Sequence, residues 1–340
     1  MQPGSGSLKE TELRREAGAL GTQNSPVPGP APPDVRGDGI AIRVRGLRKR
    51  YGSVEAVRGI DLTVRTGEIF AFLGPNGAGK TTAVETLEGY RHRDAGEVEV
   101  LGTDPARPAP GWRVRIGVVL QKSDPEAELT VEECVSLYAG YYPKPRPVAE
   151  TLELVGLAHR RAARCGRLSG GQQRRLDVAL ALIGDPELVF LDEPTTGFDP
   201  AARQSAWEVI AGLRDLGKTI FLTTHYMEEA ERLADQIAVI AAGRIVAEGT
   251  AVTLGGRDAE ASILSFTLPS GVFAADLPPV VAAAMSSAPG GKVEAQTTSP
   301  LPLLGAMAAW AKARNVDLPD IQVIRPTLED TYLRLTRETR

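Results

Sequence analysis

The sequence predicts an α/β fold with a mostly parallel sheet, followed by a smaller α+β region at its C-terminal end. Two observations lead to this fold class. Short apolar runs typical of buried strands, such as residues 68–73 and 188–191, alternate with stretches that suit helices, and this alternation favours parallel βαβ units. After about residue 256 the composition shifts towards Pro, Ala and Ser, which indicates a domain boundary.

The N-terminal region differs in composition from the rest of the chain. Residues 1–38 are rich in Gly, Pro, Ser and charge, so we expect a disordered tail there. The tail lacks the apolar h-region of a signal peptide. The main domain, residues 39–256, begins with strand-like alternation at 40–44 and again at 60–64. A buried strand then enters a glycine-rich loop, and a helix is expected from Thr81.

The second half of the main domain is predicted to hold a helical subdomain and the rest of the sheet. Residues of about 129–184 suit helices, interrupted by Pro143, Pro145 and Pro147, and the helical subdomain is expected over about 122–184. The remaining strands are predicted at 188–191, 219–224 and 236–240. Residues 257–340 are then expected to form a C-terminal accessory domain of α+β type.

The bulk composition excludes several classes of protein. The 340 residues are 42% hydrophobic and 24% charged, which is an ordinary globular balance. A net charge of −4 gives no global basic field, so we do not expect nucleic acid as a partner. No run approaches the ~20 apolar residues of a membrane-spanning helix. The only cysteines, Cys134 and Cys165, suit a reducing cytoplasm better than a disulfide framework.

A glycine-rich loop carries the first chemical signal. Residues 74–81 fit the phosphate-binding pattern GxxxxGK[ST], in which backbone N–H groups point at phosphate oxygens and a helix N-terminus adds positive potential. We expect Lys80 to reach the β- and γ-phosphates of a nucleotide and the Thr81 hydroxyl to ligate Mg²⁺. An ordinary glycine turn is the alternative, but the strand before the loop and the helix after it favour nucleotide binding. The predicted nucleotide-binding residues of this loop are Gly74, Pro75, Asn76, Gly77, Ala78, Gly79, Lys80, Thr81 and Thr82.

A second signal is the apolar strand 188–191, which ends in two carboxylates, Asp192 and Glu193. A strand end can hold a carboxylate rigidly opposite a phosphate loop, so we expect Asp192 on the metal side. Glu193 is the candidate for polarising the attacking water. The pair alone is a weak signal, because acidic residues often close a buried strand.

The third signal is the sequence Leu168-Ser169-Gly170-Gly171-Gln172, placed before a helical run. A serine and glycines at a helix N-terminus form an anion site. This pattern resembles the signature motif of ABC (ATP-binding cassette) ATPases, and the resemblance extends over about residues 42–249. It implies a P-loop NTPase core with a β-subdomain and a helical signature subdomain. It also implies that Ser169, Gly170, Gly171 and Gln172 contact the ATP that is held by the other subunit.

The same resemblance gives roles to single residues. Tyr51 resembles the aromatic residue that stacks on adenine, although a lone Tyr before Gly is a weak match. Gln121 resembles the Q-loop glutamine, which contacts Mg²⁺ and the γ-phosphate. Asp199 resembles the D-loop aspartate at the dimer interface, and His225 resembles the switch histidine. The implied catalytic residues are Glu193, His225, Lys80 and Gln121, and the implied metal ligands are Thr81, Gln121 and Asp192.

The resemblance further implies a transport role. Two cassettes, either two copies of this chain or this chain and a paralogue, would sandwich two ATP molecules and drive a separate membrane permease from its cytoplasmic face. A coupling helix of the permease would contact residues of about 122–142. The segment 324–333 is similar to the C-terminal ending of the ABC-2 export branch, to which daunorubicin-type exporters belong. As a helix it would turn Leu328, Tyr332 and Leu333 inward.

Other readings stay open at this point. A soluble ABC ATPase of translation usually carries two cassettes, and one of DNA repair carries a long coiled-coil insertion; this chain has one P-loop and a short helical region. A nucleotide-binding regulator without activity is disfavoured by Glu193 and His225. An importer cassette would work with a substrate-binding protein. We expect instead an exporter of a drug, antibiotic or lipid-like compound.

Overall fold

The computed structural model describes residues 39–119, 126–259, 261–269, 271–286, 292–318 and 320–337. The tail expected at residues 1–38 and the predicted site residue Gln121 lie outside this part of the chain.

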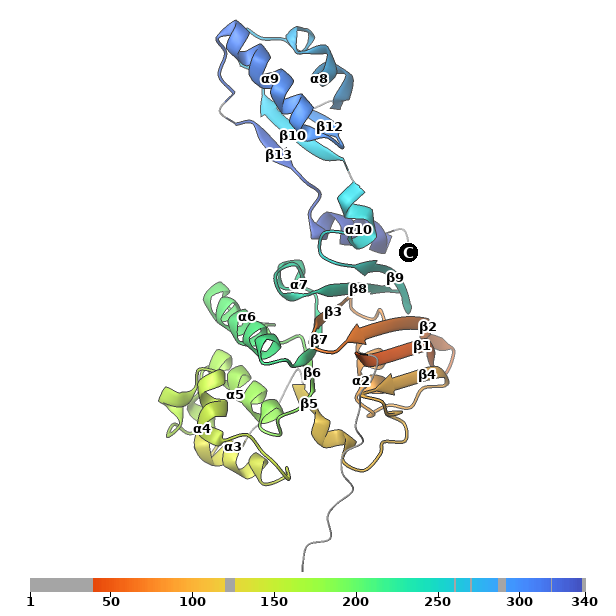
Figure 1. Cartoon of the computed structure of the whole chain (residues 1–340), viewed down its shortest axis with the longest axis vertical. Helices are drawn as coiled ribbons and strands as arrows, with labels where there is room; N and C mark the ends of the chain where they lie inside the picture. Colours follow the sequence, from red (N-terminus) through yellow and green to blue (C-terminus); the bar gives the residue numbers. More distant parts are fainter. Residues whose placement is uncertain are drawn as a thin grey trace, which may run out of the picture. The chain divides into compact units, whose positions relative to one another are not determined.

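A six-stranded sheet forms the centre of the fold, with strand order β5-β6-β7-β3-β8-β9 (Figure 1). The first five strands in this order are parallel, and β9 is antiparallel to β8. The expected α/β class is therefore confirmed. The strands are β3 (Ile69–Leu73), β5 (Ile116–Val119), β6 (Leu188–Asp192), β7 (Thr219–Thr224), β8 (Gln236–Ala241) and β9 (Arg244–Gly249).

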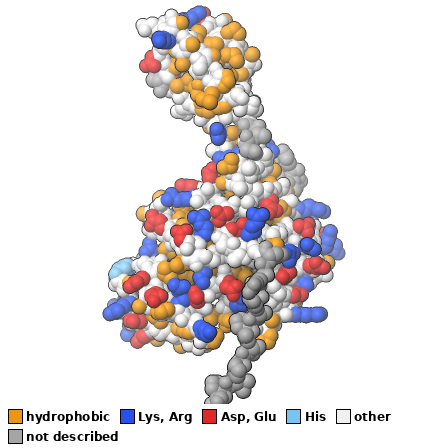
Figure 2. Space-filling view, viewed as in Figure 1, with side chains coloured by type: hydrophobic (Ala, Val, Ile, Leu, Met, Phe, Trp, Pro, Cys, Tyr) orange, Lys and Arg blue, Asp and Glu red, His pale blue; other side chains and the backbone are white. Residues whose placement is uncertain are grey.

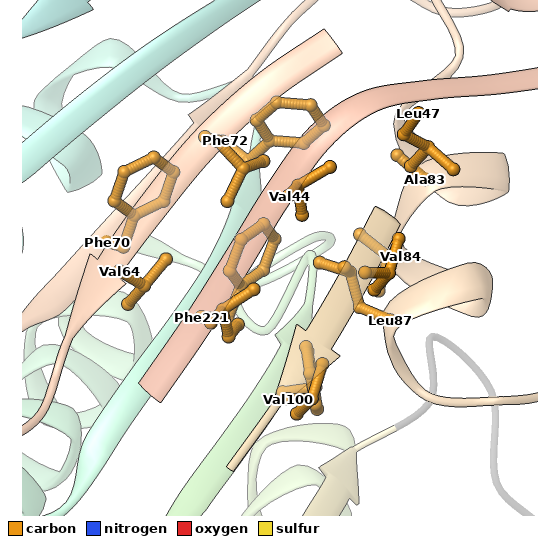
Figure 3. Packing of buried hydrophobic residues seen from close by; sticks show 14 of the residues in the cluster. Val44, Leu47, Val64, Phe70, Phe72, Ala83, Val84, Leu87, Val100 and Phe221 are labelled. Carbon is orange, nitrogen blue, oxygen red and sulfur yellow. The ribbon is translucent and has the colours of Figure 1, made fainter. Parts of the chain in front are cut away.

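One face of the central sheet packs against an antiparallel sheet of three strands, with order β2-β1-β4. Side chains from β1 and β3 meet those of helix α2 (Lys80–Leu87) in a continuous apolar layer (Figure 3). Phe70 and Phe221 stack there, with ring centroids 5.5 Å apart. This packing fixes α2, and with it the glycine-rich loop, against both sheets. The three strands are β1 (Ile40–Tyr51), β2 (Val54–Arg65) and β4 (Ala95–Val100).

The opposite face of the central sheet is covered by helices. Helices α3, α4, α5 and α6 share one apolar cluster with the sheet residues Ile69, Val189 and Ile220. The three prolines at 143, 145 and 147 lie between α3 and α4, as the sequence suggested. The helices are α3 (Val131–Ala139), α4 (Val148–Leu154), α5 (Gly170–Leu182), α6 (Pro200–Asp215) and α7 (Met227–Leu233), with short 3-10 turns η1 (Trp112–Arg115), η2 (Ala158–Arg160) and η3 (Cys165–Arg167).

A second, four-stranded sheet lies in the C-terminal region, with strand order β11-β12-β10-β13. Helices α8 and α9 pack on it around a separate core that includes Leu264, Phe266, Val281 and Met307 (Figure 1). Its elements are β10 (Ser262–Thr267), η5 (Ala274–Asp276), α8 (Pro279–Ala284), β11 (Met285–Ser286), β12 (Lys292–Thr297), α9 (Pro300–Arg314) and β13 (Gln322–Ile324).

The last helix, α10 (Leu328–Arg337), packs on α7, on β9 and on η4 (Leu254–Ala259). Leu328 and Tyr332 join a cluster with Leu254, as expected. The expectation that Leu333 faces inward is wrong, because that side chain is 40% exposed. The buried stripe of α10 contains Leu328 and, three and four positions later, Thr331 and Tyr332. Leu333 is five positions after Leu328, so its side chain is rotated away from this stripe.

Charged side chains of both signs are interspersed over the face of the molecule in Figure 2. On that face, the described residues form no large patch of a single sign. None of the described helices is long and apolar enough to cross a bilayer.

Candidate active site

The loop after β3 shapes a phosphate-sized cradle because of its glycines. Gly77 and Gly79 have left-handed backbones, with φ of 79° and 106°. A Cβ on Gly79 would lie 2.4 Å from the Ala56 carbonyl oxygen, so only glycine fits there. Helix α2 starts at Lys80, directly after this turn, and its first N–H groups face the loop. The adjoining cavity has a volume of about 340 Å³ and is lined by Ala56, Asn76, Gly77, Gly79, Lys80, Thr81, Thr82, Asp192 and Glu193.

Lys80 is folded back over the loop, and its side chain is only 7% exposed. Its Nζ donates hydrogen bonds to the carbonyl oxygens of Gly74 (2.7 Å) and Pro75 (3.2 Å). Burial lowers the pKa of Lys80, while the nearby carboxylates of Glu193 and Asp192 act in the opposite direction. An ammonium group has three N–H donors, so one remains for a phosphate oxygen.

Thr223, on β7, holds the two carboxylate residues at the end of β6. Its hydroxyl donates to Oδ1 of Asp192 and accepts a hydrogen bond from the backbone N–H of Glu193 (3.1 Å). The Glu193 N–H also donates to the Thr223 carbonyl oxygen (3.1 Å). The sequence analysis missed this residue, although two threonines close β7 just before His225.

Glu193 has an unusual backbone for a residue with a side chain, with φ of +45°. A left-handed conformation at such a residue costs on the order of 1–3 kcal/mol and is often found at functional sites. Its Oε1 lies 3.4 Å from Nδ1 of His225, and its Oε2 accepts a hydrogen bond from the Thr196 hydroxyl (3.2 Å). The turn therefore places Glu193 in the lining of the cavity, with its carboxylate beside His225.

The signature residues form a capped helix start. The Ser169 hydroxyl accepts a hydrogen bond from the backbone N–H of Gln172 (3.4 Å), and Gln172 Oε1 accepts one from the backbone N–H of Ser169 (3.1 Å). This reciprocal pair is a capping box, which fixes the N-terminus of α5. Ser169 and Gly170 are exposed. Within the described residues, the signature does not line the cavity of its own chain.

Two further predicted residues also lie outside that cavity lining. Tyr51, at the end of β1, is 41% exposed, with the Arg91 guanidinium 5.2 Å and Lys49 Nζ 5.7 Å from its ring centroid. Asp199 caps helix α6, because its Oδ1 accepts a hydrogen bond from the backbone N–H of Ala202 (2.8 Å). The structure thus brings together the P-loop, Asp192, Glu193 and His225, and leaves Tyr51, Asp199 and the signature apart from them in one chain.

The sequence analysis also missed a buried carboxyl group close to this site. Glu88, at the end of α2, is only 6% exposed. Burial is the main cause that raises its pKa to about 8, with Asp192 and Glu85 adding to the rise. The local sequence shows little sign of this burial, because a glutamate between Leu87 and Gly89 would ordinarily be expected at the surface.

Two parts of the chain match known families. Residues 57–196 match the family described as ABC transporter, and residues 262–327 match the ABC transporter domain-containing protein-like, C-terminal domain.

Full-length relatives cover nearly the whole chain. The chain is 38% identical to the daunorubicin resistance ATP-binding protein DrrA3 of Streptomyces coeruleorubidus, over 88% of this chain and 97% of that protein. It is also 38% identical to the Nod factor export ATP-binding protein I of Ralstonia nicotianae, over 88% and 95% of the two chains.

Solved structures resemble the central part of the chain. An ATP-binding subunit of an ABC transporter superposes with a TM-score of 0.57 at 27% identity, covering 62% of this chain and 90% of that one. The cbiO1 protein of Clostridium perfringens, part of the ABC transporter complex cbiONQ, gives a TM-score of 0.57 at 27% identity, covering 63% and 89%.

Proposed function

Because this chain belongs to the ATP-binding subunits of ABC transporters, we propose that it hydrolyses ATP in the cavity between its P-loop and the end of β6. It is the ATP-binding and ATP-hydrolysing subunit of an ABC exporter. The observation that carries the site assignment is that Lys80, Thr81, Asp192 and Glu193 line one cavity, with His225 in contact with Glu193.

Binding of the phosphates is assigned to the loop and to Lys80. The backbone N–H groups at the start of α2 and around Gly77 and Gly79 suit phosphate oxygens. Lys80 adds a positive charge. Its ammonium group donates to the carbonyl oxygens of Gly74 and Pro75, and its third N–H can donate to a phosphate oxygen. Adenine stacking is assigned to Tyr51, whose ring is exposed.

The residues fit a Mg²⁺ ion that arrives with ATP. The Thr81 hydroxyl and the Asp192 carboxylate are hard oxygen ligands on the same cavity, and the Thr223 hydroxyl fixes one oxygen of Asp192. Gln121, the third proposed ligand, lies outside the described residues. When bound, Mg²⁺ would neutralise charge on the transferring phosphoryl group.

Glu193 is proposed as the general base for the attacking water. Its carboxylate is held by the Thr196 hydroxyl on one oxygen and faces His225 with the other. The contact with Glu193 orients the imidazole ring of His225, which is proposed to contact the γ-phosphate. Positioning and electrostatic stabilisation then supply most of the rate enhancement, as in other phosphoryl transfers.

A second cassette is proposed to complete each site. Ser169, Gly170, Gly171 and Gln172 of a second copy, or of a paralogue, would face the γ-phosphate, and Asp199 would lie at the interface. The Ser169 hydroxyl accepts the Gln172 N–H within its own helix, so its proton remains free to be donated to a phosphate oxygen. ATP would therefore bridge the two cassettes, and hydrolysis would release them.

The membrane partner is proposed to be an ABC-2-type permease, with this subunit held peripherally at the cytoplasmic face. Support comes from the C-terminal segment 324–333 and from relatives named for daunorubicin resistance and Nod factor export. From these names we propose a drug, an antibiotic or a lipid-like compound as the cargo. Residues 39–256 are proposed as the cassette, with about 122–184 as its helical subdomain, and residues 257–340 as the accessory region.

A groove suits the coupling element of the permease. It has a volume of about 240 Å³ and lies between the end of α2 and the helices α3 and α5. Its lining includes Tyr138 and Tyr142, from the segment that the sequence analysis assigned to the permease contact. Residues 122–125 of that segment lie outside the described residues.

Hydrolysis by the wild type and by Glu193→Gln, each run on size exclusion with and without ATP, tests the proposal. We expect slow hydrolysis by the wild type, a rate near zero for the variant, and a dimer of the variant that forms only with ATP. Normal hydrolysis by Glu193→Gln would rule out Glu193 as the base. ATP binding without hydrolysis by either protein, even with the permease present, would favour a nucleotide-binding regulator.

A further inference from the structure

The turn that carries Glu193 depends on contacts from other elements. Its backbone is left-handed at Glu193, a conformation that the local sequence does not favour. On one side, β7 holds the turn through Thr223. Further along the turn, the Thr195 hydroxyl donates to the buried carboxylate of Glu229 on α7 (2.9 Å).

On the other side, Arg174 of helix α5 binds the turn through its backbone. Its Nη2 donates to the Asp192 carbonyl oxygen (2.7 Å), and its Nε donates to the Pro194 carbonyl oxygen (3.2 Å). These two carbonyls flank Glu193. The Asp192 carbonyl belongs to the peptide plane that sets φ of Glu193, so the guanidinium fork fixes the plane from which the catalytic side chain projects.

Arg174 is buried to an extent that is rare for a guanidinium, with 9% of its surface exposed. Burial is the main cause that lowers its pKa, and the nearby carboxylates of Asp177, Asp192 and Glu229 counter that effect. Asp177, one turn along α5, lies 3.8 Å from Nη1 and supplies the counter-charge. Burying a guanidinium group costs desolvation free energy, even when the group is paired. Its use to bind two carbonyl oxygens therefore indicates that its rigid, planar geometry is needed here.

The position of Arg174 on α5 also connects the Glu193 turn to the signature residues. It lies five residues after Ser169, whose capping box forms the N-terminus of the same helix. Within one chain, the signature residues and the Glu193 turn are thus joined through one helix and one guanidinium group.

We propose that Arg174 is a positioning residue for ATP hydrolysis, which holds the Glu193 carboxylate in its reactive direction and ties it to the signature helix. The inference rests on the proposed role of Glu193 as the base. We expect lysine to be a poor replacement for Arg174, because an ammonium group lacks the planar fork that holds the two carbonyl oxygens in one fixed arrangement.

Kinetics of Arg174→Lys and Arg174→Met test the inference, with Arg257→Lys as the matched control. The Arg257 guanidinium also donates to two backbone carbonyls, those of Pro326 (2.7 Å) and Ala251 (2.6 Å), and it pairs with Glu231 (2.9 Å). We expect kcat of both Arg174 variants to fall about 10- to 100-fold, since small misplacements of a catalytic group have effects of this size. The KM for ATP should stay within about 2-fold, because ATP is held by the P-loop. Arg257→Lys should keep the wild-type kcat.

A second readout separates positioning from general support of the fold. In the Glu193→Gln background, Arg174→Lys should leave both the residual rate and the ATP-dependent dimer unchanged, because a positioning residue acts only through the group that it positions. A wild-type kcat for Arg174→Lys would overturn the inference. A parallel loss of kcat, ATP affinity and dimer formation would also overturn it. If Glu193→Gln itself hydrolyses ATP, the proposed base fails instead, and the two failures can be told apart.

Discussion

Glu88→Gln is expected to change how the stability of this protein depends on pH. The Glu88 carboxyl is 6% exposed, and its pKa is raised from the ordinary value of 4.5 to about 8. The folded chain therefore holds this proton between about pH 4.5 and pH 8, whereas the unfolded chain releases it. Stability from this group is complete below pH 4.5 and is lost as the pH rises through 8.

The size of the effect follows from the shift. At about 1.4 kcal/mol for each pKa unit, the full rise corresponds to about 5 kcal/mol, and the window from pH 6 to pH 8 contains about 2–3 kcal/mol of it. Glutamine has nearly the shape of a protonated glutamic acid and does not titrate. The variant should therefore match the wild type only below about pH 4.5 and be about 4 kcal/mol more stable at pH 8, with about 2–3 kcal/mol of that difference developing between pH 6 and pH 8.

Urea denaturation at pH 5.5, 6, 7 and 8 measures this difference. Glu85→Gln serves as the control on the same helix, since Glu85 pairs with Arg91 nearer the surface. Its free energy of unfolding should keep most of the wild-type slope against pH, because Glu85 is the smallest of the three causes that raise the pKa of Glu88. Equal slopes for the wild type and Glu88→Gln would refute the reasoning, because Glu88 would then carry no extra proton in the folded state.

Three further substitutions have definite expected results. Gly79→Ala should weaken ATP binding at least about 10-fold in a fluorescent-nucleotide titration, since its Cβ would meet a backbone carbonyl oxygen at 2.4 Å; wild-type affinity would refute the geometry of the loop. Thr223→Val keeps the side-chain shape but removes the hydrogen bond to Asp192, so kcat should fall about 10-fold or more with little change in fold; an unchanged kcat would exclude a role for Thr223. Leu328→Ala should lower the free energy of unfolding by about 2–5 kcal/mol, with an unchanged KM for ATP in whatever protein stays folded; a loss below about 1 kcal/mol would mean that α10 is not anchored by this side chain.

The elements that could be predicted from the sequence were those with strong local patterns. The strand around Phe70 and the strand ending at Asp192 appear where continuous apolar runs predict them, because parallel strands covered on both faces need no alternation. The helix after Ser169 was also predicted, with a serine and glycines at its N-terminus, although the capping box between Ser169 and Gln172 was not.

The supporting contacts of the site could not be predicted in this way. Thr223 and Arg174 reach the Glu193 turn from elements about thirty and twenty residues away, and no periodicity marks which threonine or arginine does so. The burial of Glu88 likewise depends on how α2 packs, which the local composition does not reveal. The mistake at Leu333 arose from assigning an inward face to a short helix by hydrophobicity alone, where a buried threonine takes the place.

The pairing of β10 with β13 has a consequence for how the C-terminal region can change. Ile263 and Ile324 are direct partners on these antiparallel strands, so the chain enters and leaves the second sheet at neighbouring points. Before it, η4 contributes Leu254 to an apolar cluster with strands β3 and β8, and after it α10 contributes Leu328 to the same cluster. In topological terms the second sheet is an insertion between two anchored helices. It could be shortened, exchanged or replaced by a tight turn while the ATP-binding part of the chain keeps helix α10, which makes this position suitable for diversification and for the grafting of foreign modules.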